Sequence, residues 1–257
     1  MFQRTTPRNI VCDTLFEACA APLPPPDTIT VAVSLYNYAA FIPECLSSIA
    51  EQTHQALDLI VVDDHSTADA AVTVTTDWMK THHRRFARAT LLRHRRNQGL
   101  AETRNTAFLH ARTDPVFVMD ADNLIYPRAL ARLHEFVAHR DYDVAYTQLE
   151  LFGEARRPGY ADVWDKEIFR YGNYVDAMAL VSRASWAEVG GYSHIQGGWE
   201  DYDFWCKFVE AGMTGAYVPE MLCRYRVHGT SMMRTESTIS EEQIRTQMIM
   251  RHPWLRI

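Results

Sequence analysis

Short apolar runs alternate with helix-like segments along the first half of the chain. The apolar runs are rich in β-branched residues and predict buried strands at residues 28–35, 57–62, 89–93 and 115–119. The segments between and after them have apolar residues at helical spacing and predict helices at residues 41–52, 68–82, 99–111 and 127–139. Strands that alternate with helices indicate an α/β fold, with a mostly parallel central sheet flanked by helices.

The second half of the chain has a less regular pattern. It predicts strands at residues 144–151, 178–182 and 215–219, and helices at residues 185–189, 201–211 and 241–251. Near the N-terminus, three consecutive prolines at residues 24–26 can neither continue a helix nor lie in a central strand. We therefore expect an arm or short helix with a linker over residues 1–27, one α/β domain over residues 28–233 and a helical extension over residues 234–257.

Composition and charge narrow the class of protein. The 257 residues are 47% hydrophobic and 23% charged, which is typical of a globular protein and excludes wholesale disorder. The net charge of −6 disfavours a nucleic-acid partner, and no apolar stretch is long enough to span a bilayer. Five scattered cysteines and the absence of a secretory signal sequence indicate a cytoplasmic protein without a disulfide framework.

Acidic residues follow two of the predicted strands at the point where each strand ends. Asp120 and Asp122 flank Ala121, and carboxylates at this spacing can share a hard divalent cation; the alternative is a turn, which aspartate favours. Asp63 and Asp64 follow another strand, where a carboxylate can accept hydrogen bonds from a nucleobase or a ribose; the alternative is a helix N-cap. Ligands of parallel sheets bind at this edge.

Two further candidates lie in the second half. Residues 197–203 (GGWEDYD) combine a tryptophan that can stack on a sugar with three acids, one of which could serve as a general base. The alternative is that these acids stabilise the N-terminus of a helix. His228 could complete a metal site, although a lone histidine also has structural roles. Serine-hydrolase, phosphate-loop and standard dinucleotide-binding motifs are absent.

Eight short segments occur in a set order along the chain. They are residues 33–37 (VSLYN), 47–53 (SSIAEQT), 61–67 (VVDDHST), 97–105 (NQGLAETRN), 119–123 (MDADN), 189–192 (VGGY), 199–203 (WEDYD) and 225–228 (YRVH). In this order they resemble the family 2 glycosyltransferases, which have the GT-A fold with a Rossmann-like N-terminal half, over about residues 28–233. His65 departs from the pattern, because the family usually has glycine or asparagine there.

The resemblance implies a nucleotide-sugar donor, most often a UDP-sugar. By matching positions, Ser34 and Tyr36 line the nucleotide pocket, Asp64 accepts a hydrogen bond from the uracil N3–H, and Arg104 approaches the donor from the segment that follows the third strand. These assignments come from the resemblance and are expectations for the structure.

The resemblance also implies a divalent metal, Mn²⁺ or Mg²⁺. Asp122 is expected to bind it directly, with His228 as a further protein ligand. Asp120 is expected to face the ribose or the water shell of the metal, with Ala121 beside it on the nucleotide sugar.

The catalytic base of the family matches Asp201, which implies an inverting glycosyl transfer to an acceptor hydroxyl. Trp199 and Glu200 are expected beside the acceptor or the sugar, and Asp176 is a further candidate for the sugar pocket. The aromatic, loop-like residues 156–174 are expected to form an acceptor wall or lid.

A glycan or a lipid-linked saccharide is the expected acceptor, in bacterial surface polysaccharide synthesis. We expect the protein to act in the cytoplasm, with peripheral association at the inner face of the membrane as an option. Two alternatives stay open at this point. They are a metal-dependent nucleotidyltransferase and a non-catalytic nucleotide-sugar-binding module of a larger synthase.

Overall fold

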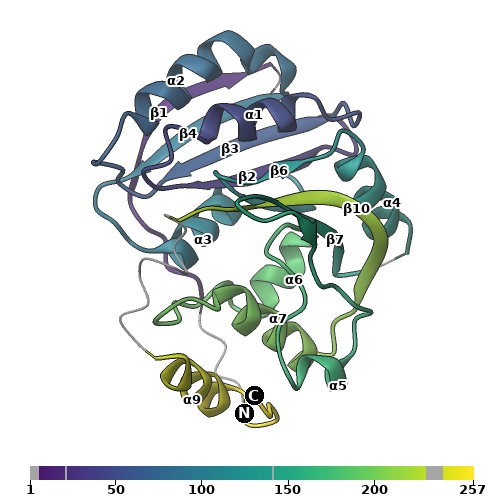
Figure 1. Ribbon diagram of the computed structural model, residues 1–257. Helices are drawn as coiled ribbons and strands as arrows, with labels where there is room; N and C mark the ends of the chain where they lie inside the picture. Colours follow the sequence, from purple (N-terminus) through teal and green to yellow (C-terminus); the bar gives the residue numbers. More distant parts are fainter. Residues whose placement is uncertain (1–5, 21, 141, 230–239) are drawn as a thin grey trace.

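The computed structural model describes residues 6–20, 22–140, 142–229 and 240–257. Ten strands of these residues form one sheet in the order β1-β4-β3-β2-β5-β9-β7-β10-β6, with β8 beside β7. Figure 1 shows the sheet in the upper part of the molecule, α5 and α7 below it, and α9 with the C-terminus at the bottom.

The N-terminal half is built on four parallel strands. β2 (Ile29–Leu35) lies between β3 (Leu57–Asp63) and β5 (Val116–Asp120), and β4 (Arg88–His94) lies on the far side of β3. Every residue of β2 and β3 is buried, as expected for strands that are covered on both faces. The predicted α/β fold with a Rossmann-like half is confirmed.

Helices cover both faces of the sheet and form two cores. The first core contains residues of α1 (Ile42–Ala50), α2 (Ala71–His82) and α4 (Ala129–Arg140). The second contains residues of α3 (Leu100–His110), α6 (Arg183–Glu188) and α7 (Glu200–Glu210). Alternate residues of β2 belong to different cores, because successive side chains of a strand point to opposite faces.

The second half extends the sheet beyond β5. β9 (Ala179–Val181) pairs antiparallel with both β5 and β7 (Val144–Gly153), and β10 (Gly215–Val227) lies parallel to β7. The prediction ended this last strand at Pro219, but it continues to Val227. The register is irregular between Val218 and Cys223, and such an irregularity accommodates a proline inside a strand.

The N-terminal residues differ from the expected arm or short helix. Cys12–Cys19 form β1, an antiparallel edge strand beside β4. Most of its side chains are exposed or half-buried, so the segment has no apolar run by which to recognise a strand. Ion pairs tie it to β4 and the loop after it, with Arg88 2.8 Å from Glu17 and Arg95 2.9 Å from Asp13.

Several short elements were not predicted. They are η1 (His83–Arg85), β6 (Leu124–Ile125), β8 (Arg157–Pro158) and α5 (Lys166–Phe169). The predicted terminal helix is present as α9 (Glu241–Arg251), which begins with a capping box between Ser240 and Gln243. Among the described residues no helix has the length and apolarity required to cross a membrane. All five cysteines are free thiols.

Candidate active site

A cavity of about 1050 Å³ lies where β2, β3 and β5 end. The start of α7 forms part of the same wall. The predicted site residues that line the cavity are Ser34, Tyr36, Asp64, Arg104, Asp120, Asp122, Asp176, Trp199, Glu200 and Asp201. The fold therefore brings together residues that are separated by more than half of the sequence.

Asp64 anchors the loop that follows β4. Its Oδ1 accepts a hydrogen bond from the backbone N–H of Gln98 at 2.8 Å, and its Oδ2 accepts one from Gly99 at 2.8 Å. The Nδ1 of buried His94 lies 2.7 Å from Oδ1. A carboxylate offers about four acceptor positions, so Oδ2 retains capacity for a ligand at the cavity wall.

The turn after β3 holds the loop that carries Tyr36. The backbone N–H of Asn37 donates to Ser66 Oγ at 2.8 Å, and Ser66 N–H donates to the Asp63 carboxylate at 3.2 Å. His65 adopts a left-handed backbone with φ of 64°, a conformation that glycine and asparagine adopt most easily. Neither Asp63 nor Asp64 caps α2, because its N-cap position lies further along the chain, at Ala70.

Arg104 and Asp120 form an ion pair at the cavity wall. The Nη2 of Arg104 lies 3.1 Å from both carboxylate oxygens of Asp120, and the guanidinium lies 5.3 Å from the ring centroid of Tyr192. Burial alone would lower the pKa of Arg104, but the carboxylates of Asp120, Asp201 and Glu200 outweigh it and raise the pKa. Arg104 Nε is buried and has no hydrogen-bond partner among the described residues.

Asp122 and His228 lie side by side at the end of the sheet. The Nε2 of His228 is 2.9 Å from Asp122 Oδ2, and its ring packs against Tyr38 and Phe41. Arg226 brings the end of β10 to this position, since its Nε donates to the Asp122 carbonyl at 2.7 Å. The two predicted metal ligands, which are far apart in sequence, are therefore neighbours.

The donor set at this position fits a cation that also uses oxygens of a ligand. Two ligands at about 2.2 Å from a metal and at a right angle lie about 3.1 Å apart, close to the separation of His228 Nε2 and Asp122 Oδ2. Over the described ranges, no group of three or more histidine, cysteine, aspartate or glutamate side chains is arranged to hold a metal by itself. Further ligands would have to come from water or from a bound diphosphate.

Two predicted residues lie outside the cavity wall. Ala121 is fully buried, and its backbone N–H donates to the Ser34 carbonyl at 3.1 Å, so it holds β5 against β2. The two flanking aspartates line the cavity, whereas the side chain of Ala121 points into the core. His228 does not line the cavity but contacts Asp122, which does.

Asp201 lies in the first turn of α7 and faces the cavity. Its Oδ2 accepts a hydrogen bond from Asn173 Nδ2 at 2.9 Å. Burial raises its pKa, and the positive charge of Arg104 opposes that change. Trp199, at the N-cap position, has a left-handed backbone with φ of 72°, and the two preceding glycines also have positive φ. This tight turn presents the indole and the Asp201 carboxylate to one cavity.

Two more acids share this end of the cavity. Burial raises the pKa of Asp176 to about 7, and it raises the pKa of Glu200 to about 7 as well. Asp176 accepts a hydrogen bond from the Met178 N–H at 2.8 Å, and Asp201 adds to the negative potential at both acids. Acids held in a desolvated, negatively charged pocket are typical of functional sites.

Asp203, the third acid of the same motif, has a different environment. It is fully buried, with Lys207 Nζ 3.0 Å from its Oδ2 and the ring nitrogen of His252 3.0 Å from its Oδ1. Burial favours the neutral form, but His252, Lys207 and Arg251 outweigh it and lower the pKa of Asp203. Asp203 does not line the cavity, so it cannot accept a proton from a ligand there.

Sequence comparison identifies the family. Residues 30–178, more than half of the chain, match the family described as Glycosyl transferase family 2. The chain belongs to glycosyltransferase family 2. The resemblance predicted from the eight segments is confirmed.

Individual relatives of this glycosyltransferase are distant. It is 27% identical over 219 residues to the putative glycosyltransferase EpsE of Bacillus subtilis, with 82% of this chain and 77% of EpsE covered. It is also 27% identical over 191 residues to the O-antigen biosynthesis protein RfbC of Myxococcus xanthus, with 73% of this chain but 15% of RfbC covered.

Solved structures of similar fold include two proteins with bound nucleotide sugars. S. aureus TarS 1–349 in complex with UDP-GlcNAc matches with a TM-score of 0.72 and 16% identity, over 87% of this chain and 66% of that chain. A mannosyltransferase from Pyrobaculum calidifontis, in complex with GDP-Man and Mn²⁺, matches with a TM-score of 0.65 and 21% identity, over 96% of this chain and 66% of that chain. These likenesses confirm the GT-A fold.

Sequence reasoning missed two groups of residues that shape the site of this glycosyltransferase. One is Asn105, which the sequence showed only as part of a motif. Its Nδ2 donates to the Tyr192 carbonyl, and its Oδ1 accepts from the Tyr192 N–H and from Trp186 Nε1, so it fixes the residue that packs on Arg104. The C-terminal helix also contributes Glu241 and Arg245 to the cavity wall. Nothing in the helical pattern of residues 241–251 indicates which element that helix packs against.

Proposed function

We propose that this glycosyltransferase is an inverting, metal-dependent enzyme that transfers a sugar from a UDP-sugar to an acceptor hydroxyl. One observation carries the proposal. The Asp201 carboxylate faces the same cavity as Asp64, Asp120 and Asp122, so a base and a set of donor-binding residues lie on different sides of one space. The volume of about 1050 Å³ is at the upper end of ligand pockets, which suits a donor together with an acceptor.

The nucleotide occupies the end of the cavity at β2 and β3. Ser34 and Tyr36 line the nucleotide pocket, and Asp64 Oδ2 accepts the uracil N3–H. Tyr36 is 41% exposed, so its ring is free to pack on a base. Arg104 lies toward the donor, and its unpartnered Nε is available for a hydrogen bond to the sugar or a phosphate. Asp120 faces the ribose.

Asp122 and His228 would hold Mn²⁺ or Mg²⁺. The ion would neutralise the negative charge that develops on the departing nucleoside diphosphate. The structurally similar mannosyltransferase of Pyrobaculum calidifontis contains Mn²⁺ beside GDP-Man, which supports the assignment.

Asp201 is the proposed general base. Its carboxylate takes the proton from the acceptor hydroxyl while that oxygen forms a bond to the anomeric carbon of the sugar. The bond from this carbon to the diphosphate breaks on the opposite face, and UDP leaves with the electron pair. Burial raises the pKa of Asp201, which makes its ionised form a stronger base near neutral pH. Asn173 holds the carboxylate in place through its side-chain amide.

The proposed acceptor is a glycan or a lipid-linked saccharide. Trp199 and two exposed tyrosines, Tyr160 and Tyr171, line the cavity and can stack on sugar rings. RfbC, a relative named for O-antigen biosynthesis, supports a role in surface polysaccharide synthesis. We propose that the reaction takes place in the cytoplasm, where free thiols remain reduced, at or near the inner face of the membrane.

A thermal-shift screen of UDP- and GDP-sugars, with and without Mn²⁺, tests the donor. A bound donor raises the melting temperature, because it binds the folded state by mass action. The donor that shifts the transition is then incubated with the enzyme. Release of nucleoside diphosphate supports the transferase, release of pyrophosphate supports a nucleotidyltransferase, and binding without turnover supports a non-catalytic module.

Metal dependence has a direct test at Asp122 and His228. Chelation is expected to abolish turnover, and added Mn²⁺ or Mg²⁺ to restore it. Asp122→Ala should lose turnover even at high metal concentration, whereas His228→Ala should raise the metal concentration needed for half-maximal turnover. Full turnover in the presence of a chelator would contradict the metal assignment.

The role of Asp64 in base recognition can be measured with UDP. Loss of a hydrogen bond to a charged group costs about 1.5–3 kcal/mol, so Asp64→Ala should weaken UDP binding by roughly ten- to a hundredfold. Asp64 also anchors Gln98 and Gly99, so its loss could disturb the loop as well as the ligand contact. His94→Gln is the matched control for this structural effect, because it removes one contact of Asp64 and leaves the carboxylate in place. Equal UDP affinity of Asp64→Ala and wild type in calorimetry would remove Asp64 from the site.

A further inference from the structure

The C-terminal segment, residues 240–257, forms part of the cavity wall. Glu241 and Arg245 of α9 line the cavity, and so does Ile257. Gln247 Nε2 lies 3.5 Å from the carbonyl of Gln196, in the loop that leads to α7. At the other end, Arg256 N–H donates to the Arg170 carbonyl at 2.8 Å. The segment therefore lies beside the start of α7 and the loop after α5, opposite the sheet edge.

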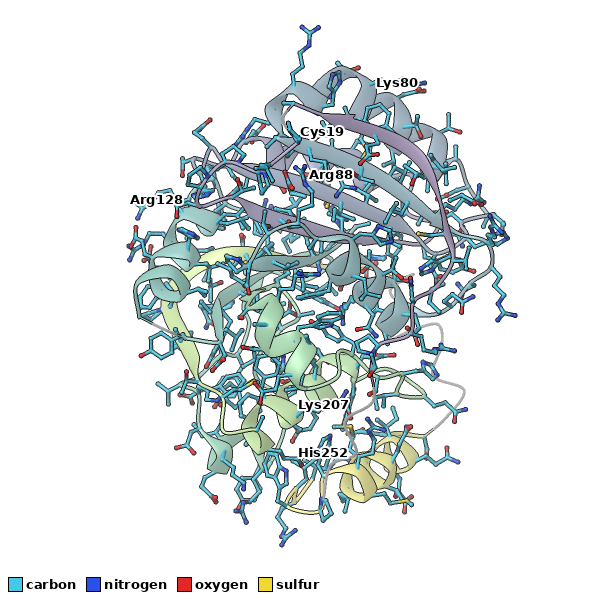
Figure 2. All side chains as sticks on the ribbon, turned by 180° about the vertical axis from the view of Figure 1, so that it is seen from behind. Cys19, Lys80, Arg88, Arg128, Lys207 and His252 are labelled. Atoms are coloured by element: carbon cyan, nitrogen blue, oxygen red, sulfur yellow. The ribbon has the colours of Figure 1, made fainter. Side chains whose placement is uncertain are left out.

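A buried cluster of charges fastens this segment to α7. His252 is fully buried, with Nε2 3.0 Å from Asp203 Oδ1 and Nδ1 2.7 Å from Glu210 Oε1. The neighbouring residues reinforce both contacts, because Arg251 Nε lies 2.5 Å from Asp203 and Trp254 Nε1 donates to Glu210 at 2.7 Å. Figure 2 shows His252 beside α9 and Lys207 above it.

The geometry determines the charge of His252. A neutral imidazole has one N–H and one acceptor nitrogen, whereas an imidazolium donates from both. His252 faces a carboxylate at each nitrogen. Asp203 stays ionised because Lys207 and Arg251 also contact it. Both contacts of His252 are therefore hydrogen bonds only when the ring is protonated.

We propose that Asp203, Glu210 and His252 are positioning residues that hold the C-terminal segment as the acceptor-side wall of the active site while His252 is protonated. The assignment to the acceptor side rests on the function proposed above, since the donor contacts lie at the sheet edge and Asp201 lies at the start of α7. The attachment itself depends only on the contacts around His252.

The attachment weakens as the pH rises. Burial alone would lower the pKa of His252, but its hydrogen bonds to Asp203 and Glu210 outweigh burial and raise the pKa. A group whose folded pKa is raised contributes stability below its unfolded pKa, about 6.5 for histidine, and loses it as pH rises through the folded value. The charged groups around the ring are Asp203, Lys207 and Glu210 of α7 and Arg251 of α9, with Lys166 over the Trp254 ring at 5.3 Å.

Hydrogen exchange of the α9 amides tests the proposal on the full chain. The protection factors of Glu241–Arg251 are first corrected for the intrinsic pH dependence of exchange. In the wild type they should fall at least tenfold between about pH 6 and about pH 9. His252→Gln, which keeps a donor but no charge, should show the low protection at both pH values. His82→Gln, at an exposed histidine of α2, is the matched control and should behave as the wild type.

Two further measurements keep the outcomes distinct. Amides of β3 should remain protected in His252→Gln, which separates release of the segment from global unfolding. UDP affinity of this variant should stay within about threefold of wild type, since the nucleotide pocket lies at the sheet edge. Wild-type protection of α9 in His252→Gln at about pH 6 would overturn the attachment, and a tenfold loss of UDP affinity would overturn the acceptor-side placement. Absence of UDP binding to the wild type would instead refute the proposed donor.

Discussion

Asp201 and Asp203 lie two residues apart on α7 and have opposite environments. Asp201 faces the cavity, its side chain is bonded by the neutral amide of Asn173, and burial raises its pKa. Asp203 faces the core, where Lys207, Arg251 and His252 surround it and lower its pKa. Because two residues along a helix differ by about 200° in direction, one acid points to the cavity and the other to the C-terminal segment.

The comparison shows what makes an acid available for catalysis. A general base has to reach the substrate and bind a proton near the working pH. Asp201 faces the cavity and has a raised pKa, which fits this proposed role. Asp203 is satisfied by cations, so protonation would break a buried network. Asp203 is one of the three acids of the same motif, and its cationic surroundings exclude it as the base.

Asp201→Asn is expected to give the largest effect on turnover. The amide keeps the size of the side chain but cannot take a proton, so turnover should fall by roughly 10²–10⁴. UDP and metal affinity should stay within about threefold, because the role of Asp201 begins at the acceptor. Initial rates of nucleoside diphosphate release, with calorimetry for binding, provide the measurement. Wild-type turnover in this variant would contradict the assignment.

Asp203→Asn is expected to give the largest effect on stability. Removing the charge leaves Lys207, Arg251 and His252 without their common partner, and breaking a buried ion pair costs about 3–5 kcal/mol. The melting temperature should fall by roughly 10 °C. Asp77→Asn is the matched control, because its ion pair with Lys80 is exposed and should contribute little. An unchanged melting temperature would show that the cluster does not stabilise the fold.

The pH dependence of turnover sharpens the distinction. As the proposed base, Asp201 must be ionised to act. Burial raises its pKa, and burial also raises the pKa of its neighbours Asp176 and Glu200 to about 7. At saturating donor, turnover should therefore decrease as the pH is lowered, with an apparent pKa above the ordinary value for aspartate, about 3.9. The residual turnover of Asp201→Asn should lack this dependence. An apparent pKa equal to the ordinary aspartate value would instead indicate a base that is exposed to solvent.

Glu200→Gln is expected to give the smallest effect, a gain in stability. Burial raises the pKa of Glu200 to about 7 in the folded state. At pH values between the pKa of the unfolded state and that of the folded state, the folded protein therefore binds more protons than the unfolded protein. Stability of the wild type therefore falls as pH rises through this range, and a glutamine does not titrate. The variant should melt a few degrees higher than wild type at about pH 8 and gain less at about pH 4. A lower melting temperature at both pH values would instead assign Glu200 a structural role.

Much of the fold and site follows from local sequence. The buried strands β2 and β3 are continuous apolar runs, and an apolar run that ends in aspartates places those acids at the sheet edge whatever surrounds it. The order of the eight segments identified the family, and with it the positions of Asp64, Asp122 and Asp201 in one cavity. These features depend on residues close together in the chain or on an order that can be read from the sequence.

Other features were decided only by tertiary packing. The edge strand β1 has no apolar periodicity, and its pairing with β4 joins residues that are 69 to 82 positions apart in the sequence. Likewise, Asp201 and Asp203 belong to one acidic motif, and only the direction in which each side chain leaves the helix places one at the cavity and the other in the core. The C-terminal helix was predicted from its own residues, but its place at the cavity came from His252 meeting Asp203 and Glu210. Local sequence determines which element forms, whereas the charge and accessibility of a side chain depend on what distant parts of the chain place around it.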